Sequence, residues 1–241
     1  MDYLGLSFDQ LDEEAVAALL RGRGTGAAFA YLVTPNVDHV VRLSKLDHDS
    51  PEWRAYAGAD WRLCDSRVLA RLAALQGRKL PVVPGSDLTT RLLRDIAAPG
   101  DRICLIGGEA GDPAVLCALR PDLAFVQHIP PMGLQADGAA RLAAARFAAE
   151  SGARFTLLAV GSPQQELIAA AIRAMPGACG TGLCIGASID FLVGRQTRAP
   201  RWMQRLSLEW LHRLLGNPRR FGRRYLVDGP RIFWLAWRDR S

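Results

Sequence analysis

The sequence has very little lysine and no paired-cysteine motif. Among its 30 basic residues only Lys45 and Lys79 are lysines, and the other basic side chains are all arginine. Its five cysteines are scattered, with no CxxC pair and no histidine at metal-ligand spacing. Three of them, Cys64, Cys104 and Cys184, lie inside apolar runs, where a free cysteine usually acts as a small buried side chain. We therefore expect structural thiols in a reducing compartment, not disulfides or a zinc site.

Long apolar segments are also missing. No run approaches the roughly 20 apolar residues that a transmembrane helix requires, and the first residues lack the basic start and apolar centre of a signal peptide. Disorder is excluded as well, because 49% of the 241 residues are hydrophobic and only 22% are charged. These features predict a cytoplasmic globular protein with a chain long enough for a substantial core.

Positive charge is unevenly distributed along the chain. Residues 195–241 hold twelve arginines and three acidic residues, a local charge of +9, so residues 1–194 carry −3 of the total +6. Four of the six tryptophans fall in the same basic segment. Helices that combine arginine with bulky apolar residues suit a membrane surface with anionic headgroups. The alternative is a helical tail packed on the rest of the protein, with arginine stems covering apolar surface.

Short apolar runs alternate with helical periodicity through the first 194 residues. The predicted strands are Ala27–Val33, Trp61–Cys64, Arg102–Ile106, Ala124–Ile129, Phe155–Val160 and Leu183–Ile185. The predicted helices between them include Glu13–Leu20, Val37–Leu46, Arg67–Leu75, Asp87–Ile96, Ala136–Glu150 and Gln164–Met175. This order predicts an α/β fold with a mostly parallel sheet flanked by helices. A further helix is predicted over Arg201–Leu215.

A polar or glycine-containing motif follows each predicted strand. These motifs are Thr34-Pro35-Asn36, Asp65-Ser66, Gly107-Gly108, Pro130-Pro131-Met132-Gly133, Gly161-Ser162-Pro163-Gln164-Gln165-Glu166 and Gly186-Ala187-Ser188-Ile189-Asp190. Ligands bind parallel sheets in the crevice at the carboxyl ends of the strands, so we expect a binding cleft there. For any single motif, glycine and proline that merely end a strand are an equally good interpretation.

The second half of the chain resembles the WecG/TagA/CpsF glycosyltransferase family. The resemblance rests on Gly161–Glu166, on Gly186–Gly194, and on the segments Arg198–Arg205, Leu208–Leu214, Asn217–Arg220 and Arg223–Tyr225. Thr34-Pro35-Asn36, Asp65 and Gly85-Ser86-Asp87-Leu88 follow the family's order in the first half. The resemblance implies a Rossmann-like catalytic domain over residues 1–194 and a helical, basic, membrane-associating appendage over 195–241 that completes the active site.

The resemblance also implies an activity. It indicates an inverting glycosyltransferase that uses neither metal nor cofactor and moves a sugar from a UDP-sugar to a polyprenyl-diphosphate-linked saccharide. Members of the family act at the cytoplasmic membrane face in the synthesis of bacterial surface polysaccharides, such as exopolysaccharides and capsules. We expect no nucleic-acid partner, and an exposed apolar tail could associate into a homo-oligomer in solution.

Three residues match the family's catalytic positions. Asp65 matches the proposed base, which would take the proton of the acceptor hydroxyl. Its alternative interpretation is the N-cap of the following helix. Thr34 and Asn36 would orient a sugar by hydrogen bonds, or would simply form the turn that Pro35 fixes between strand and helix.

Further residues are expected to hold the nucleotide. Ser162 and Pro163, after Gly161, stand at a helix start, where free backbone N–H groups favour an anion. The side chains of Gln164 and Gln165 are expected to contact the UDP moiety or the sugar, and the backbone at Gly186 is expected to approach the nucleotide closely. The Asp190 carboxylate would accept a hydrogen bond from a ribose or sugar hydroxyl, and the glycine turn Gly107-Gly108 would lie near the nucleotide. Arg219, Arg220, Arg223 and Arg224 are expected to bind diphosphate or lipid headgroups, with Arg220 and Arg224 contributing most.

The sequence departs from the family pattern at three places. Ser66 stands where the family has glycine, and Gln164 replaces a lysine. Val82 replaces an arginine expected in the active site, and nothing in the sequence shows that Arg78 substitutes for it. These changes indicate a divergent member with a different sugar donor.

Three other interpretations of the sequence compete with a glycosyltransferase. A dinucleotide-dependent oxidoreductase would need a glycine fingerprint after a strand, but Gly22–Gly26 precedes the first strand of the predicted sheet. A metal-dependent transferase would need an Asp-x-Asp motif. Asp47-His48-Asp49 has that residue order, but it lies in a polar loop just before Ser50-Pro51. A non-enzymatic protein would use the basic segment to bind nucleic acid or a membrane.

Overall fold

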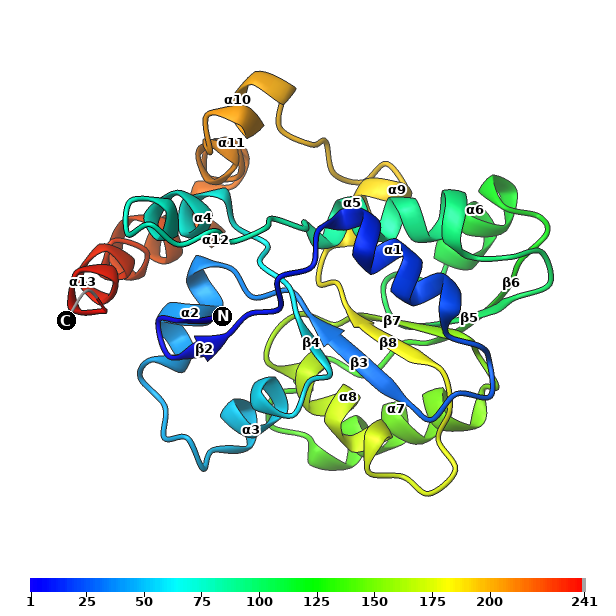
Figure 1. Ribbon diagram of the computed structural model, residues 1–241. Helices are drawn as coiled ribbons and strands as arrows, with labels where there is room; N and C mark the ends of the chain where they lie inside the picture. Colours follow the sequence, from blue (N-terminus) through cyan, green and yellow to red (C-terminus); the bar gives the residue numbers. More distant parts are fainter. Residues whose placement is uncertain (240–241) are drawn as a thin grey trace.

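The computed structural model describes residues 1–239, without the side chains of Arg201 and Arg220. Its main sheet has six strands, all parallel, in the order β4-β3-β8-β7-β5-β6 (Figure 1). The strands are β3 (Ala30–Val33), β4 (Trp61–Arg62), β5 (Arg102–Gly107), β6 (Ala124–His128), β7 (Phe155–Ala159) and β8 (Thr181–Cys184). Each coincides with a predicted run to within a few residues. The predicted Rossmann-like α/β fold is therefore confirmed.

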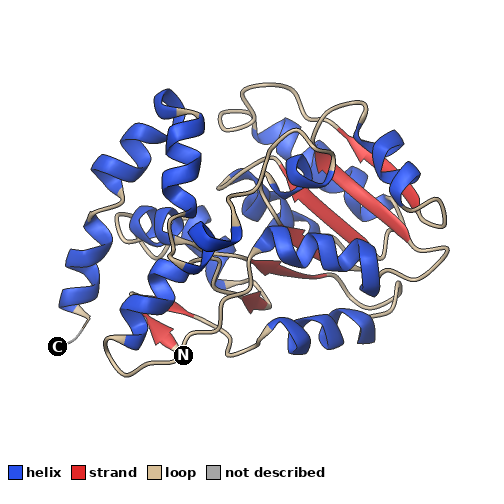
Figure 2. Ribbon diagram, turned by 90° about the horizontal axis from the view of Figure 1, so that it is seen from above, coloured by secondary structure: helices blue, strands red, loops and turns tan. Residues whose placement is uncertain are grey.

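Helices cover both faces of this sheet (Figures 1 and 2). One face carries α1 (Glu13–Gly22), α5 (Gly85–Arg91), the π-helical turn η1 (Leu92–Ile96), α6 (Asp112–Leu119) and α9 (Ser188–Leu192). The other carries α2 (Val37–Leu43), α3 (Pro51–Ala57), α4 (Arg67–Ala74), α7 (Gly138–Glu150) and α8 (Gln164–Arg173). Neighbouring strand residues point to opposite faces, so Leu105 enters the first core and Ile106 the second. Burial on both faces explains the continuous apolar runs of the strands.

A small hairpin at the start of the chain was not predicted. Strands β1 (Asp2–Tyr3) and β2 (Leu6–Ser7) form a two-stranded antiparallel sheet. The turn between them contains Leu4 with a φ of 54° and Gly5 with a φ of 81°. Strands of two residues are too short to show an alternating pattern in the sequence.

The C-terminal segment is a series of short helices. It consists of α10 (Arg201–Arg205), α11 (Glu209–Gly216), α12 (Pro218–Gly222), the π-helical turn η2 (Arg223–Asp228) and α13 (Arg231–Arg238). The single helix expected over Arg201–Leu215 is wrong, because the chain turns between α10 and α11. Ser207 lies in that turn with a φ of 62°, a left-handed conformation that a continuing α-helix does not contain.

Helix α13 returns to the N-terminal part of the chain. Ile232 is only 1% exposed and belongs to the same core as α2 and α4. Gln76 donates a hydrogen bond to the Ala236 carbonyl at 2.7 Å, and the Leu4 amide donates to the Asp239 carboxylate at 3.3 Å. The last helix is thus anchored on the α/β region beside the N-terminal hairpin.

Candidate active site

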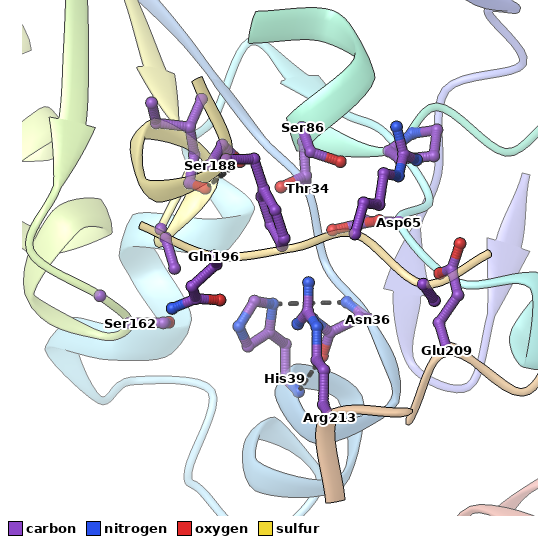
Figure 3. Close-up of a pocket in the computed structure, with 18 of the residues that line it drawn as sticks. Thr34, Asn36, His39, Asp65, Ser86, Ser162, Ser188, Gln196, Glu209 and Arg213 are labelled. Atoms are coloured by element: carbon purple, nitrogen blue, oxygen red, sulfur yellow. Dashed lines mark hydrogen bonds between the residues drawn. The ribbon is translucent and has the colours of Figure 1, made fainter. Parts of the chain in front are cut away.

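A polar cavity of about 200 Å³ lies at the carboxyl ends of four neighbouring strands. Thr34 and Asn36 follow β3, and Asp65 follows β4. Gly161, Ser162 and Gln165 follow β7, and Gly186 follows β8; all of these line the cavity (Figure 3). Parallel strands end at one edge of a sheet, which is why residues 150 positions apart in the sequence meet here. A cleft is therefore present at four of the six expected strand ends, whereas the motifs Gly107-Gly108 and Pro130–Gly133, which follow β5 and β6, do not line it.

Asp65 is not the N-cap of helix α4. The cap is Ser66, whose Oγ accepts the backbone N–H of Leu69 at 3.2 Å, so the Asp65 carboxyl faces the cavity instead. Burial raises the pKa of Asp65 to about 7, an effect that Glu209 reinforces and that Arg213 and Arg198 oppose. A carboxyl group with a pKa near neutrality can change protonation state during a reaction at physiological pH. Asp65 is therefore a carboxyl group that can exchange its proton near neutral pH.

Asn36 and Thr34 have structural bonds as well as a place in the cavity. The Asn36 Oδ1 accepts the backbone N–H groups of Asp38 at 3.1 Å and His39 at 3.4 Å, which caps helix α2. The Thr34 hydroxyl donates to the Cys184 carbonyl at 3.2 Å, joining the ends of β3 and β8. The turn interpretation of this motif is thus correct, and the same turn presents both residues to the cavity.

His39 is a cavity residue that the sequence did not single out. Its Nδ1 accepts the Asn36 backbone N–H at 3.3 Å, which leaves the ring proton of the neutral imidazole on Nε2. Burial lowers the pKa of His39 well below its usual value, and the nearby Arg42 and Arg224 lower it further. His39 is therefore a neutral hydrogen-bond donor. The signal that could have found it is its position three residues after a capping asparagine.

The two glycine-containing motifs after β7 and β8 are joined at the cavity. Gln165 accepts the Gly186 backbone N–H on its Oε1 at 2.8 Å and donates from Nε2 to Glu166 at 2.8 Å. Pro163 precedes α8 directly, which confirms the predicted helix start. Pro163 and Gln164 do not line the cavity, and the Gln164 Oε1 accepts a bond from Arg141 at 3.4 Å instead.

Several expected nucleotide contacts lie elsewhere. A Cβ at Gly107 would approach Val160 to 2.8 Å, and one at Gly108 would overlap the Asp112 carboxylate. Both residues also have a positive φ, so close packing and backbone conformation require glycine at each. Neither lines the cavity. Asp190 also stays outside, because its carboxylate accepts hydrogen bonds from Arg195 at 2.7 Å and from Gln196 at 3.0 Å.

Of the three predicted C-terminal arginines whose side chains the structure describes, Arg224 alone lines the cavity. Its Nε lies 3.3 Å from the Asp38 carboxylate of α2. Arg219 is exposed, and Arg223 has a side chain that is 88% exposed. Arg220 belongs to α12, but its side chain lies outside the described part of the structure.

Arg198 and Arg213 line the cavity, although neither was predicted from the sequence as a site residue. Arg198 pairs with both carboxylate oxygens of Asp87 at the start of α5, with one contact at 2.8 Å. Burial lowers the pKa of its guanidinium. Arg213 belongs to α11 and lies over the Phe191 ring at 5.8 Å. Together with Arg224, they give the cavity three cationic side chains beside Asp65.

An apolar groove of about 380 Å³ adjoins the polar cavity. The two share five residues, namely Asn36, Asp65, Glu209, Arg213 and Arg224. Beyond them its apolar lining consists of Val37 and Val68 from the α/β region and of Trp210, Tyr225, Leu226, Ile232 and Phe233 from the C-terminal segment. Asp38, Ser66, Arg67 and Ser207 are polar or charged residues that also line it. Charged groups thus lie at the junction, with polar surface on one side and apolar surface on the other.

Exposed large apolar side chains are concentrated in the C-terminal segment, and two of them, Leu226 and Phe233, line this groove. Those in the C-terminal segment are Trp202, Leu206, Leu215, Leu226, Val227, Phe233, Trp234 and Trp237, each at least 46% exposed. Across residues 1–239, the structure has no helix with both the length and the apolar character needed to cross a bilayer.

The competing motifs do not reach the cavity. Gly22–Gly26 joins the end of α1 to the loop before β3, and Asp49 is exposed and paired with Arg54 at 3.0 Å. No group of three or more His, Cys, Asp or Glu side chains that could hold a metal ion occurs within residues 1–239.

Comparison with known protein families gives one match that spans residues 1–241. The matching model describes glycosyl transferases of the WecG/TagA/CpsF family. The match covers both the strand ends that form the polar cavity and the C-terminal helices that complete it. The chain therefore belongs to the WecG/TagA/CpsF family of glycosyltransferases.

Proposed function

We propose that this glycosyltransferase moves a sugar, with inversion, from a UDP-sugar to a polyprenyl-diphosphate-linked saccharide in the synthesis of a bacterial cell-surface polysaccharide. The observation that carries the proposal is the junction of a polar cavity with an apolar groove at Asp65. A nucleotide sugar matches the polar side, and an isoprenoid chain matches the apolar side. The reacting groups would meet between them.

Asp65 is the base of the proposed reaction. The ionised carboxylate removes the proton from the acceptor hydroxyl as the hydroxyl oxygen bonds to the anomeric carbon of the donor sugar. The bond from that carbon to the UDP oxygen breaks on the opposite face, so the configuration inverts. The raised pKa of Asp65 supports this role, because a carboxylate with a pKa of about 7 is a stronger base than an ordinary one.

Arginines stabilise the departing diphosphate in this proposal. Arg198, Arg213 and Arg224 all line the polar cavity, and guanidinium groups match phosphate oxygens with paired hydrogen bonds. The proposed mechanism therefore assigns to cationic side chains the charge neutralisation that a metal ion provides in other transferases. His39 and Thr34 would bind hydroxyl groups of the donor from the same side.

We further propose that residues 1–194 act as the catalytic domain and residues 195–241 as the membrane-facing appendage. Three cavity arginines and most of the apolar groove come from the second part, so it would complete the active site. Its exposed tryptophans and leucines would contact the cytoplasmic face of the membrane, where a polyprenyl-linked acceptor resides.

The test is a donor screen with two forms of one acceptor saccharide. The wild-type protein is incubated with each of a set of UDP-sugars and either a short polyprenyl-diphosphate-linked saccharide or the same saccharide without lipid. We expect transfer from one UDP-sugar, in the presence of EDTA, to the lipid-linked form far more rapidly than to the free saccharide. No transfer from any UDP-sugar, or equal rates with the two acceptors, would overturn the proposal.

A further inference from the structure

A fully buried carboxylate lies directly behind the polar cavity. Glu166 is in the first turn of α8 and has no exposed surface. It accepts hydrogen bonds from the Tyr56 hydroxyl at 2.9 Å, the Ser162 hydroxyl at 2.7 Å and the Gln165 side-chain amide at 2.8 Å. These donors come from α3, from the loop after β7 and from α8. A buried charge is costly unless such bonds compensate it, and the three donors supply that compensation. An apolar side chain would fill the same space without needing them, so we looked for what the carboxylate does in this position.

The bond to Gln165 determines how that side-chain amide is oriented. Its Nε2 faces the Glu166 carboxylate, so its Oε1 faces the backbone N–H of Gly186 at 2.8 Å. If the amide flipped, an N–H group would face the Gly186 N–H, and the Oε1 would face the carboxylate. Both contacts would be repulsive. Glu166 therefore connects the loop after β7, through Ser162, and the first turn of α8, through Gln165, to the loop after β8.

Both loops form walls of the polar cavity. Ser162 lines it together with Gln165 from the first turn of α8, and Gly186 lines it together with Ser188 from the start of α9. Figure 3 labels Ser162 and Ser188 at the cavity. Arg42 extends the network, because it donates to the Ser162 hydroxyl at 2.7 Å and pairs with Glu52. The loops are thus held by one continuous set of hydrogen bonds whose central acceptor is Glu166.

We propose that Glu166 is a positioning residue for the donor nucleotide sugar, acting through the Gln165 amide to hold the Gly186 loop in its binding conformation. This inference rests on the function proposed above. Glu166 itself touches no substrate. It lowers the cost of ordering the site at the moment when the donor binds, and a preorganised site binds more tightly than one that must first be ordered.

The proposal predicts a specific pattern among three variants. Glu166→Ala removes the acceptor of the Gln165 amide, so the donor KM and the Kd for UDP should rise about tenfold, the effect of about one hydrogen bond, while kcat stays within about threefold. Glu166→Gln should restore both constants to within about twofold. Its Oε1 can still accept from Gln165 and Tyr56, and its Nε2 can donate to a rotated Ser162 hydroxyl. Tyr56→Phe removes the contacts of its hydroxyl with Glu166 and Ser162 but keeps the Gln165 bonds to Glu166 and Gly186, so hydrogen exchange of the Gly186 amide should stay at the wild-type rate.

Two controls separate positioning from a general loss of stability. Leu116→Ala removes buried volume from α6, outside the cavity, and should lower the melting temperature without changing the donor KM. Hydrogen exchange of the Gly186 amide, measured without any substrate, should be faster in Glu166→Ala and unchanged in Leu116→Ala.

The outcomes distinguish this inference from the proposed function. A wild-type protein that neither binds UDP nor transfers sugar would contradict the function, and Gly186 exchange would still test the role of Glu166. An unchanged donor KM and unchanged Gly186 exchange in Glu166→Ala would overturn the inference alone, as would a Glu166→Gln variant as impaired as Glu166→Ala. If Glu166→Ala does not fold, Glu166→Asp withdraws the carboxylate by about 1.5 Å and should raise the donor KM severalfold. An unchanged KM there would also overturn the inference.

Discussion

The two regions that meet at Asp65 are held in place by different means. The strand ends follow buried strands, and behind them lies the fully buried Glu166 with three hydrogen-bond donors. The C-terminal segment has little core of its own, since α11 and η2 contain no buried residue, and it is anchored by Ile232 and by ion pairs such as Arg67–Glu209 at 3.0 Å. Ion pairs that remain partly exposed contribute little stability, whereas buried apolar contacts contribute much.

This difference suggests a division of work. Under the proposed function, the firmly packed strand ends suit the nucleotide donor, which must be placed precisely, and the lightly anchored C-terminal segment suits an acceptor that arrives from a lipid surface. The comparison predicts that changes at the strand ends alter chemistry and donor binding, while changes in the C-terminal segment alter leaving-group stabilisation and acceptor binding.

The largest effect is expected at the junction itself, with Asp65→Asn. Loss of the base should lower kcat by about 10²–10⁴-fold with little change in the donor KM. Single-turnover transfer assays and UDP binding on the same preparation would measure the two effects separately. A variant with wild-type kcat would show that another group removes the proton and that the strand ends do not supply the chemistry.

The same substitution has a pH signature. Burial raises the pKa of Asp65 from 3.8 to about 7, so the folded state holds this proton more tightly than the unfolded state does. The folded protein therefore loses at most about 4 kcal/mol of stability as the pH rises from about 4 to above 7. Asp65→Asn should raise the melting temperature more at pH 8 than at pH 5, and wild-type kcat/KM should increase as the pH rises through about 7. A pH-independent stability difference would contradict this assignment.

The next largest loss of activity is expected from a change in the C-terminal segment that weakens stabilisation of the proposed leaving group. Arg224→Ala should lower kcat/KM for the donor by about ten- to hundredfold, because a charge-assisted hydrogen bond to phosphate is lost. Arg219→Ala is the matched control, because it removes the same charge from an exposed position outside the polar cavity and the apolar groove. Its kcat/KM for the donor should stay within about twofold of the wild-type value. Equal effects of the two variants would mean that net charge, rather than placement in the cavity, accounts for the contribution.

The smallest effect is expected in the apolar groove. Phe233 lines it and is 58% exposed, so Phe233→Ala should raise the KM for the lipid-linked acceptor about threefold by removing apolar contact area. The donor KM should not change. Met132→Ala removes a fully exposed apolar side chain outside the groove and should alter neither constant. A change in the donor KM of Phe233→Ala would remove the distinction between the two regions.

Much of the strand-end side of the cavity could be predicted from the sequence. The strands were recognisable because burial on both faces requires continuous apolar runs, and Thr34, Asn36 and Asp65 follow from the rule that parallel strands end at one edge. His39 and Glu166 were missed as site residues because their surroundings depend on contacts with residues distant in the sequence, such as Arg224 for His39 and Tyr56 for Glu166.

The C-terminal side could be predicted only in outline. Its composition indicated helices with mixed basic and apolar character, but the turn at Ser207 decides where α11 begins and therefore where Arg213 lies. Arg219 and Arg223 face solvent while Arg224 lines the cavity, and a run of adjacent arginines contains no signal that separates them.

The sequence by itself determined the α/β fold, the edge of the sheet that carries the site and the contrast between an acidic first part and a basic, tryptophan-rich second part. These properties follow from local periodicity and composition, which every segment expresses on its own. Only the tertiary structure decided which arginines meet Asp65, that Gly107 and Gly108 serve packing, and that a buried carboxylate connects two loops. Burial and hydrogen-bond partners are properties of residues brought together in space, so they arise only when the chain has folded.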